Sequence, residues 1–168
     1  MLFSAAYTSP IGPVTLVSDG THLVGLWFHG QAHFMAGLTE PPIPDRQLPL
    51  FSAVSDWLDE YFSGGKPDPS VIPLRPSGTA FCRVVWQRLA AIPYGEVTTY
   101  GALASAVAAE LGRETMSARA VGNAVGRNPI SLLIPCHRVV GTGGRLTGYA
   151  GGLEKKQWLL TLEGAEGL

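Results

Sequence analysis

The stretch around which the chain is organised is Leu132-Leu133-Ile134-Pro135-Cys136-His137-Arg138-Val139-Val140. Its first residues are apolar and are typical of a buried strand. Pro135 ends that strand and redirects the chain, because its ring fixes φ and its nitrogen carries no hydrogen. A thiol and an imidazole follow at once, before apolar residues resume. The pattern predicts two reactive side chains delivered from the edge of the core into a pocket.

Cys136 and His137 are a candidate nucleophile and base. A cysteine attacks as its thiolate, so its ordinary pKa of about 8.5 must fall for efficient reaction at neutral pH. Neighbours on an extended strand point to opposite faces, so the pair needs a turn after Pro135 or a bridging water molecule. Asn128 either ties the backbone of this turn or is an ordinary Asn-Pro helix stop. A third polar group should orient the histidine, and the residues alone leave three candidates: Glu163, Glu154 and Glu96.

The composition favours a globular protein with an ample core. The 168 residues suit one large or two small domains, with 46% hydrophobic and 15% charged residues. No membrane-spanning helix or signal peptide is expected. The only cysteines are Cys82 and Cys136, which predicts a reduced, cytoplasmic protein rather than a disulfide framework. Cys82 falls within a helical pattern and is interpreted as a packing residue.

The charge is divided unevenly along the chain. Residues 1–75 carry three Lys/Arg against seven Asp/Glu, a net charge of −4. Residues 76–168 carry nine against six, a net charge of +3. A modestly basic C-terminal half could face phosphate groups, although ordinary surface scatter explains the same balance.

The first part of the chain predicts an antiparallel meander. Apolar runs at residues 2–7, 14–18 and 23–28 are typical of strands, and turn signals separate them. Asp19-Gly20 favours a two-residue hairpin between the second and third strands. No candidate for chemistry lies in this region, which we interpret as a scaffold.

The middle of the chain is rich in proline and predicts a division into domains. Residues 29–50 are expected to be irregular, and a helix is expected from Phe51 to Phe62. Four prolines in the segment that follows indicate an extended linker. The expected organisation is an N-terminal domain over residues 1–65, a linker over 66–78 and a C-terminal domain over 79–168.

The C-terminal part is predicted to be mainly helical. Thr79 and Ser117 are suited to cap helices, and Gly112 lies in a short turn between two of them, as in a helix-turn-helix. In the last helix, Lys155 and Lys156 are expected to face outward. Apolar spacing places the helices near residues 80–91, 100–111, 117–125 and 153–162.

The third of these helices is unusually small-sided, which permits close approach to another surface. Ala118, Gly122 and Asn123 are among its short side chains. Its long side chains are Arg119 and Arg127, and Arg119 either reaches into nucleic acid or is an ordinary solvated arginine.

An ordered set of segments resembles the O6-alkylguanine-DNA alkyltransferases, also called methylated-DNA–protein-cysteine methyltransferases. The resemblance covers roughly residues 79–164, whereas residues 1–65 agree only in general form. Pro-Cys-His-Arg alone is a short motif with a real false-positive risk, but the ordered set is specific. The segments are Arg119-Ala120-Val121-Gly122-Asn123-Ala124, Asn128-Pro129-Ile130, Pro135-Cys136-His137-Arg138-Val139-Val140, Gly148-Tyr149-Ala150-Gly151-Gly152-Leu153 and Lys156 through Glu163-Gly164.

The resemblance implies DNA repair by single-use transfer of an alkyl group from O6-alkylguanine to Cys136, which becomes a stable thioether. His137 would take the thiol proton through a water molecule, Glu163 would polarise His137, and Asn128 would brace the turn. No cofactor is implied. The expected fold class is α+β, and the resemblance implies a small N-terminal antiparallel-sheet domain that is ribonuclease H-like. It also implies a mainly helical, winged-helix-like C-terminal domain with a helix-turn-helix.

The implied partner is double-stranded DNA containing O6-alkylguanine, bound by a monomer that needs no membrane. The helix-turn-helix would enter the minor groove, Arg119 would fill the gap left by the flipped nucleotide, and Tyr100 would help rotate its phosphate. The implied DNA-binding residues are Arg119, Tyr100, Ser117, Ala118, Gly122, Asn123 and Arg127. The implied alkylguanine pocket consists of Tyr100, Val139, Tyr149, Ala150 and Gly151.

Two features of the chain differ from some members of that family. The region between Tyr100 and Arg119 is several residues longer than in the shortest members, which could alter DNA-backbone contacts around Arg113. Some members bind a structural zinc through N-terminal cysteines and histidines. No cysteine precedes Cys82 in this chain, so no metal is expected.

Three other functions remain open on the sequence. A non-catalytic alkyl-lesion-binding protein is one, but relatives of that kind replace the reactive cysteine that is present here. A helix-turn-helix regulator that senses alkylation is another, and such proteins usually dimerise or carry a further domain. A Cys-His hydrolase is the third, and it predicts turnover without DNA.

Overall fold

The computed structural model describes residues 1–165, and the chain divides into two compact units. Unit 1 contains residues 1–77 together with 129–131, and unit 2 contains 78–128 and the chain from Leu132 onward. Residues expected to form a linker therefore lie largely in unit 1. Residues 129–131, which were expected in the C-terminal domain, also lie in unit 1. Residues 166–168 of the expected C-terminal domain lie outside the described part of the chain. The domain limits expected from sequence stay a prediction.

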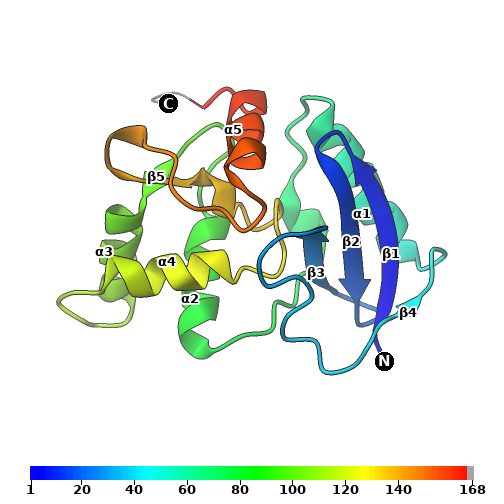
Figure 1. The fold of residues 1–168 in the computed structure, drawn as a ribbon. Coiled ribbons are helices and arrows are strands. Elements are labelled where there is room, and N and C mark those ends of the chain that lie inside the picture. The colour runs from blue at the N-terminus through cyan, green and yellow to red at the C-terminus, as the bar shows by residue number, and fades with distance from the viewer. Residues whose placement is uncertain (166–168) are drawn as a thin grey trace. The chain divides into compact units, whose positions relative to one another are not determined.

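Unit 1 is built on a four-stranded sheet with the order β3-β2-β1-β4 (Figure 1). The three predicted strands are confirmed as β1 (Phe3–Ser9), β2 (Gly12–Ser18) and β3 (Leu23–Phe28), and they pair antiparallel. A short fourth strand, β4 (Ile43–Pro44), pairs parallel to β1. The sheet is therefore mixed: the expected antiparallel strands are confirmed, and β4 adds a parallel pairing that was not expected. The proline-rich segment that contains β4 pairs with β1 at the edge of the sheet, where proline is tolerated.

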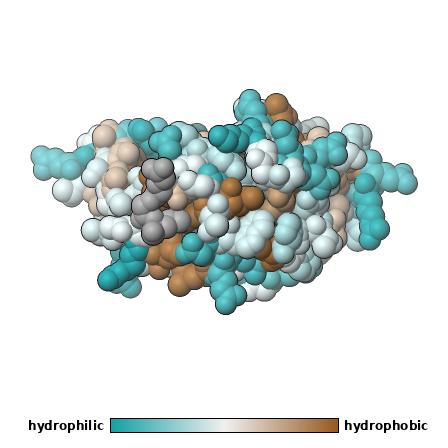
Figure 2. Space-filling view, turned by 90° about the horizontal axis from the view of Figure 1, so that it is seen from above, coloured by the Kyte–Doolittle hydropathy of each residue, from teal (hydrophilic) through white to brown (hydrophobic). Residues whose placement is uncertain are grey.

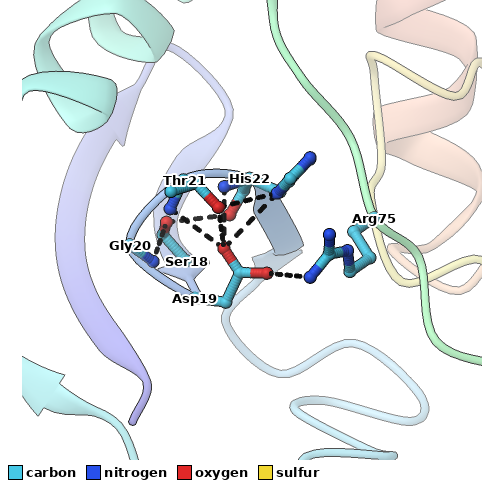
Figure 3. Close-up of polar contacts among 6 residues, drawn as sticks. All are labelled: Ser18, Asp19, Gly20, Thr21, His22 and Arg75. Carbon is cyan, nitrogen blue, oxygen red and sulfur yellow. Dashed lines mark hydrogen bonds and ion pairs between the residues drawn. The ribbon is translucent and has the colours of Figure 1, made fainter.

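The turn between β2 and β3 is organised by the side chain of Asp19 (Figure 3). Its Oδ1 accepts hydrogen bonds from the backbone N–H of Thr21 at 3.0 Å and of His22 at 2.8 Å. Its Oδ2 lies 3.0 Å from Nη1 of Arg75. The connection spans four residues rather than the predicted two, because the aspartate caps a longer loop by bonding the backbone itself.

Helix α1 (Pro49–Phe62) packs against β1 and confirms the predicted helix. A proline in its first turn costs nothing, because the amide hydrogen it lacks would have had no partner there. The helix buries a stripe of apolar residues at helical spacing: Phe51, Val54, Trp57, Leu58 and Tyr61.

Strand β3 is buried at all six positions, and two short segments of unit 1 cover its open edge. The N–H of Leu26 donates to the carbonyl of Pro129 at 2.8 Å, and the N–H of Ser131 returns a bond to Leu26 at 3.1 Å. Leu23 exchanges similar bonds with Pro73 and Arg75. The edge is thus hydrogen-bonded within the chain, which removes a template for aggregation.

Unit 2 contains four helices that confirm the predicted ones: α2 (Ala80–Ala90), α3 (Tyr100–Glu110), α4 (Ala118–Gly126) and α5 (Leu153–Leu162). Thr79 and Ser117 cap α2 and α4 as expected, each accepting a hydrogen bond from the backbone three residues later. Helices α3 and α4 pack together, and Gly112 in their connection has φ 68°. Indole Nε1 of Trp86 also donates to the Ala124 carbonyl at 2.9 Å, which ties α2 to α4.

The segment before Cys136 differs from its prediction. Leu132 and Leu133 form a turn rather than a strand, with Leu132 at φ 74°, and Ile134 makes only an isolated bridge. A single turn of 3₁₀ helix, Cys136–Arg138, follows Pro135, so the predicted turn is confirmed. The chain then enters β6 (Val139–Val140), which pairs parallel to β5 (Thr98–Thr99). The apolar run is buried in irregular backbone, which periodicity alone does not distinguish from a strand.

Large hydrophobic side chains are mostly buried in both units. On the face shown in Figure 2, hydrophobic residues are interspersed with hydrophilic ones. No helix within residues 1–165 is long and apolar enough to cross a membrane. The large apolar residues that remain exposed come from separate parts of the chain: Met1, Phe34, Ile43, Val71, Leu111 and Leu153.

Candidate active site

The turn that carries Cys136 is fixed from behind by Asn128. Its side-chain Nδ2 donates a hydrogen bond of 2.7 Å to the carbonyl of Ile134, and Asn128 is only 3% exposed. The same carbonyl accepts the N–H of Cys136 at 2.8 Å. Asn128 comes just after Arg127, the C-cap of α4, so one amide links the end of that helix to the turn before the thiol. The structure therefore favours the tying role over a simple helix stop.

Cys136 lies at the wall of a small pocket of about 120 Å³ within unit 2. Its thiol is largely buried, with 4% of the residue exposed. Tyr149 and Ala150 contribute one wall and Tyr100 another. The full lining is Tyr100, Gly122, Val125, Gly126, Cys136, Gly148, Tyr149 and Ala150.

His137 is completely buried and paired with Glu163. Nε2 of the imidazole lies 2.6 Å from Oε2 of the carboxylate, and neither side chain is exposed. Arg138 holds the same carboxylate with two donors, Nε to Oε1 at 2.8 Å and Nη2 to Oε2 at 3.2 Å. A two-point contact of this kind stabilises the ionised carboxylate and fixes its plane.

The arginine is itself anchored, so the carboxylate has a rigid frame. Nη1 of Arg138 donates to the carbonyl of Ile92 at 2.6 Å, and the guanidinium lies 5.7 Å from the centre of the Tyr94 ring. The N–H of Gly95 also approaches Oε1 of Glu163 at 3.4 Å. The structure thus chooses Glu163 among the three candidates, whereas Glu154 and Glu96 are exposed.

These contacts assign the protonation of His137. Because an ionised carboxylate only accepts, Nε2 carries the proton and Nδ1 presents a lone pair. Nδ1 is buried and has no hydrogen-bond partner among the described residues. Burial lowers the pKa of His137 below 6.5, and Arg138 and Lys156 add to this effect, although Glu163 opposes it. The imidazole is therefore neutral near pH 7 and can accept a proton.

The position of Lys156 differs from the one its sequence pattern predicts. It was expected to face outward, but it is completely buried. Its Nζ donates to the carbonyls of Thr147 and Gly148 at 3.2 and 3.0 Å. The prediction failed because these partners are backbone atoms, which leave no signature in the sequence. The sequence likewise did not predict the role of Arg138, which holds Glu163.

The outer face of α4 collects most of the residues expected to bind DNA. Val121, Ala124 and Val125 turn inward and are buried. The residues expected at DNA are exposed or half-buried on the same stretch: Ser117, Ala118, Arg119, Gly122, Asn123 and Arg127. Tyr100 lies instead at the pocket, with its ring against Gly122. A small-sided, exposed helix face with two arginines is suited to a narrow, negatively charged groove.

Nothing in residues 1–165 supports a metal site. His29 and His33 are four positions apart, a spacing that aligns two imidazoles on a helix, but the chain forms turns there. No cluster of three or more His, Cys, Asp or Glu side chains in the described part of the chain could hold a metal ion.

Two family models match the chain in the same order as its two units. The 6-O-methylguanine DNA methyltransferase ribonuclease-like domain matches residues 2–76, and the DNA-binding domain of the same enzyme matches residues 80–165. The chain belongs to the 6-O-methylguanine DNA methyltransferase family. The ribonuclease-like character expected for the N-terminal part and the DNA-binding character expected for the C-terminal part are both confirmed.

Relatives of known activity support this membership over nearly the whole chain. A methylated-DNA–protein-cysteine methyltransferase of Haemophilus influenzae is 41% identical over 166 residues, covering 96% of this chain and 86% of the relative. One of Methanosarcina acetivorans is 41% identical, covering 98% and 99%. A crystal structure of Mycobacterium tuberculosis OGT in complex with DNA superposes with a TM-score of 0.81, at 40% identity and 96% and 92% coverage.

The activity follows from this family membership. The protein is a DNA-binding methyltransferase that repairs O6-methylguanine in DNA by transfer to a protein cysteine. The expected α+β fold class is confirmed.

The structure does not bring together every residue expected in the pocket of this family. Tyr100, Tyr149 and Ala150 line it with Cys136. Val139 is instead completely buried in β6, and Gly151 packs beside the Tyr149 ring. Four lining residues were not expected in the pocket: Gly122, Val125, Gly126 and Gly148.

Proposed function

We propose that Cys136 is the cysteine that accepts the alkyl group, in a reaction that each molecule performs once. The sulfur of the thiolate would form a bond to the alkyl carbon as the bond from that carbon to O6 of guanine breaks. The electron pair of the broken bond stays with guanine, which takes up one proton to become the normal base. A thioether is a poor leaving group, so the product would not return to the starting protein.

His137 and Glu163 supply the proton transfer in this proposal. The lone pair on Nδ1 takes the thiol proton through a bridging water molecule, while Glu163 stabilises the imidazolium that forms. Asn128 keeps the thiol at the pocket by holding the preceding turn. The single observation that carries the proposal is the position of Cys136 in the pocket wall beside the buried His137–Glu163 pair.

The substrate would be double-stranded DNA with the alkylated nucleotide turned out of the helix. Flipping a nucleotide costs a few kcal/mol, roughly, and less when the base is poorly paired. The exposed face of α4 would lie in the minor groove, with Arg119 filling the gap and Arg127 near phosphate. We propose that the protein acts as a monomer, because one pocket and one helix face suffice for one lesion.

Intact-mass measurement with a lesion-containing duplex tests the proposal. Incubation with a duplex that carries O6-methylguanine should add one CH₂ to the wild-type mass and nothing to Cys136→Ala. Cys82→Ala is the matched control and should gain mass like the wild type. Gain of mass by Cys136→Ala, or continued turnover beyond one equivalent, would contradict the proposal. Retention of the duplex without mass gain would instead support a lesion-binding protein.

A further inference from the structure

Lys156 is an ammonium group buried in unit 2 without a carboxylate partner in the described part of the chain. The residue is completely buried, although it lies in the first turn of α5 beside residues that reach solvent. Among the described residues, no ion pair joins it to Asp or Glu. Burying a charge without a compensating partner costs free energy of folding. We therefore expect the ammonium to have a function that an apolar residue at this position could not perform.

The contacts of Lys156 are made to Tyr100 and to the start of the glycine-rich segment, both at the pocket. Nζ donates to the carbonyls of Thr147 and Gly148, and the ammonium lies 5.8 Å from the centre of the Tyr100 ring. The hydroxyl of Tyr100 donates to the same Thr147 carbonyl at 3.1 Å. Lys156 and Tyr100 therefore clamp the start of the glycine-rich segment from two sides.

The far end of this segment is closed by its own turn. The N–H of Gly152 donates to the carbonyl of Tyr149 at 2.9 Å, and Gly148 and Gly152 adopt φ 60° and 99°. Tyr149 and Ala150 lie between the two fixed ends and line the pocket with Cys136. A segment with three glycines in the five positions 148–152 has much conformational freedom to lose. Its position against the thiol therefore depends on these few bonds.

The charge of Lys156 also acts on the thiol. A charged Cys136 thiolate raises the pKa of Lys156, so the ammonium and the thiolate stabilise each other. Other titratable groups around the ammonium are Tyr100 from α3 and His137 beside the thiol. Burial raises the pKa of Tyr100 and lowers that of His137, so neither group changes charge near pH 8.

We propose that Lys156 is a positioning residue for alkyl transfer: its buried ammonium holds Thr147 and Gly148 and so keeps Tyr149 and Ala150 against the thiol. This inference rests on the proposed function of Cys136 as the acceptor. It goes further by assigning a role to a residue that touches neither the imidazole nor the carboxylate.

Three variants separate the charge of Lys156 from its bulk. Lys156→Met keeps an unbranched apolar stem but removes the donors and the charge, whereas Lys156→Arg keeps a charge that does not titrate below pH 12. Lys155→Met is the matched control, since it makes the same chemical change at the neighbouring, less buried position. Each is measured for thermal unfolding, duplex affinity and single-turnover transfer from a duplex carrying O6-methylguanine.

Lys156→Met should slow transfer at pH 7 about tenfold or more, because a displaced pocket wall misaligns the reacting atoms. Its duplex affinity should stay within about twofold of wild type, since Lys156 is buried and does not reach phosphate. Lys155→Met should match the wild type in transfer rate. Equal transfer rates for Lys156→Met and wild type would overturn the inference.

The pH profile gives a readout that a purely structural role would not change. Burial lowers the pKa of Lys156 from 10.5 to about 8, against the opposing effect of the Cys136 charge. The wild-type rate should therefore decline above about pH 8 as the ammonium loses its proton, and Lys156→Arg should show no such decline. A decline shared by Lys156→Arg, or absent from the wild type, would overturn the inference even if Lys156→Met does not fold. Absence of alkylation at Cys136 in the wild type would instead contradict the proposed function.

Discussion

Oε2 of Glu163 lies 2.6 Å from Nε2 of His137, and both side chains are fully buried. The two residues come from opposite ends of the C-terminal segment, one beside the thiol and the other at the end of α5. Arg138 joins the pair through the same carboxylate. One carboxylate therefore sets the tautomer of the imidazole and neutralises a buried guanidinium, so its removal should affect stability and chemistry together.

Glu163→Gln should lower the free energy of unfolding by about 3–5 kcal/mol, because it leaves the Arg138 charge buried without a partner. Transfer should also slow, since a neutral amide stabilises an imidazolium less. Urea unfolding and single-turnover transfer measure the two effects. Glu154→Gln, an exposed change on the same helix, should alter the unfolding free energy by no more than about 0.5 kcal/mol. A Glu163→Gln protein as stable as the control would show that the pairing contributes little.

The rate of alkyl transfer should stay high below pH 6.5. Burial lowers the pKa of His137 from 6.5, so the neutral base persists to lower pH than in an ordinary histidine. The unfolded chain takes up this proton near pH 6.5 while the folded protein does not, so this group should make the protein less stable as the pH falls through 6.5. Single-turnover rates and thermal unfolding across pH 5–8 measure both effects. An acid limb assigned to His137 at or above pH 6.5 would contradict the assignment.

Asn128→Ala should lower the free energy of unfolding by about 1–3 kcal/mol, because the buried Ile134 carbonyl loses a donor. The turn before Cys136 should loosen, which slows transfer while duplex binding persists. Hydrogen exchange at the Cys136 amide should quicken, since its bond to the same carbonyl is in that turn. Asn123→Ala, at an exposed position on α4, is the control for stability alone. Unchanged exchange at Cys136 would rule out the bracing role.

Arg119→Ala should leave the unfolding free energy within about 0.5 kcal/mol of wild type, because the side chain is exposed. Transfer from an intact duplex should fall, because nothing would occupy the gap left by the flipped nucleotide. Transfer from a single strand, which needs no flipping, should fall much less. Arg83→Ala is the matched control at an exposed position on α2. Equal losses on duplex and single strand would contradict a gap-filling role for Arg119.

Much of the fold was predictable because local chemistry and tertiary structure agree. Thr79 and Ser117 bond the backbone at the starts of α2 and α4, and such caps act within one helical turn. The apolar stripe of α1 faces the sheet because its spacing follows the helical period. Neither feature depends on distant parts of the chain.

The remainder depends on contacts between distant parts of the chain. Three glutamates were equivalent in the sequence, and only the packing of α5 brought Glu163 to His137. Lys156 resembles a surface residue because its partners are carbonyls. Strand β4 consists of two residues that pair with β1 across a proline-rich segment. Hydrophobic periodicity predicts which side of a helix or strand is apolar. It does not predict which backbone atoms from distant parts of the chain that side will contact.

Leu132 shows that two demands on one residue can conflict. Its φ of 74° favours glycine, and a leucine pays about 1–2 kcal/mol for that conformation. Its side chain is 2% exposed, and deleting such a side chain costs about 2–5 kcal/mol. The free energy gained by burying the Leu132 side chain exceeds the strain energy of its backbone. Packing therefore holds the backbone before the thiol in an unfavourable conformation. A cavity opened behind Leu132 should therefore let this backbone relax and move Cys136 without any change at the cysteine itself.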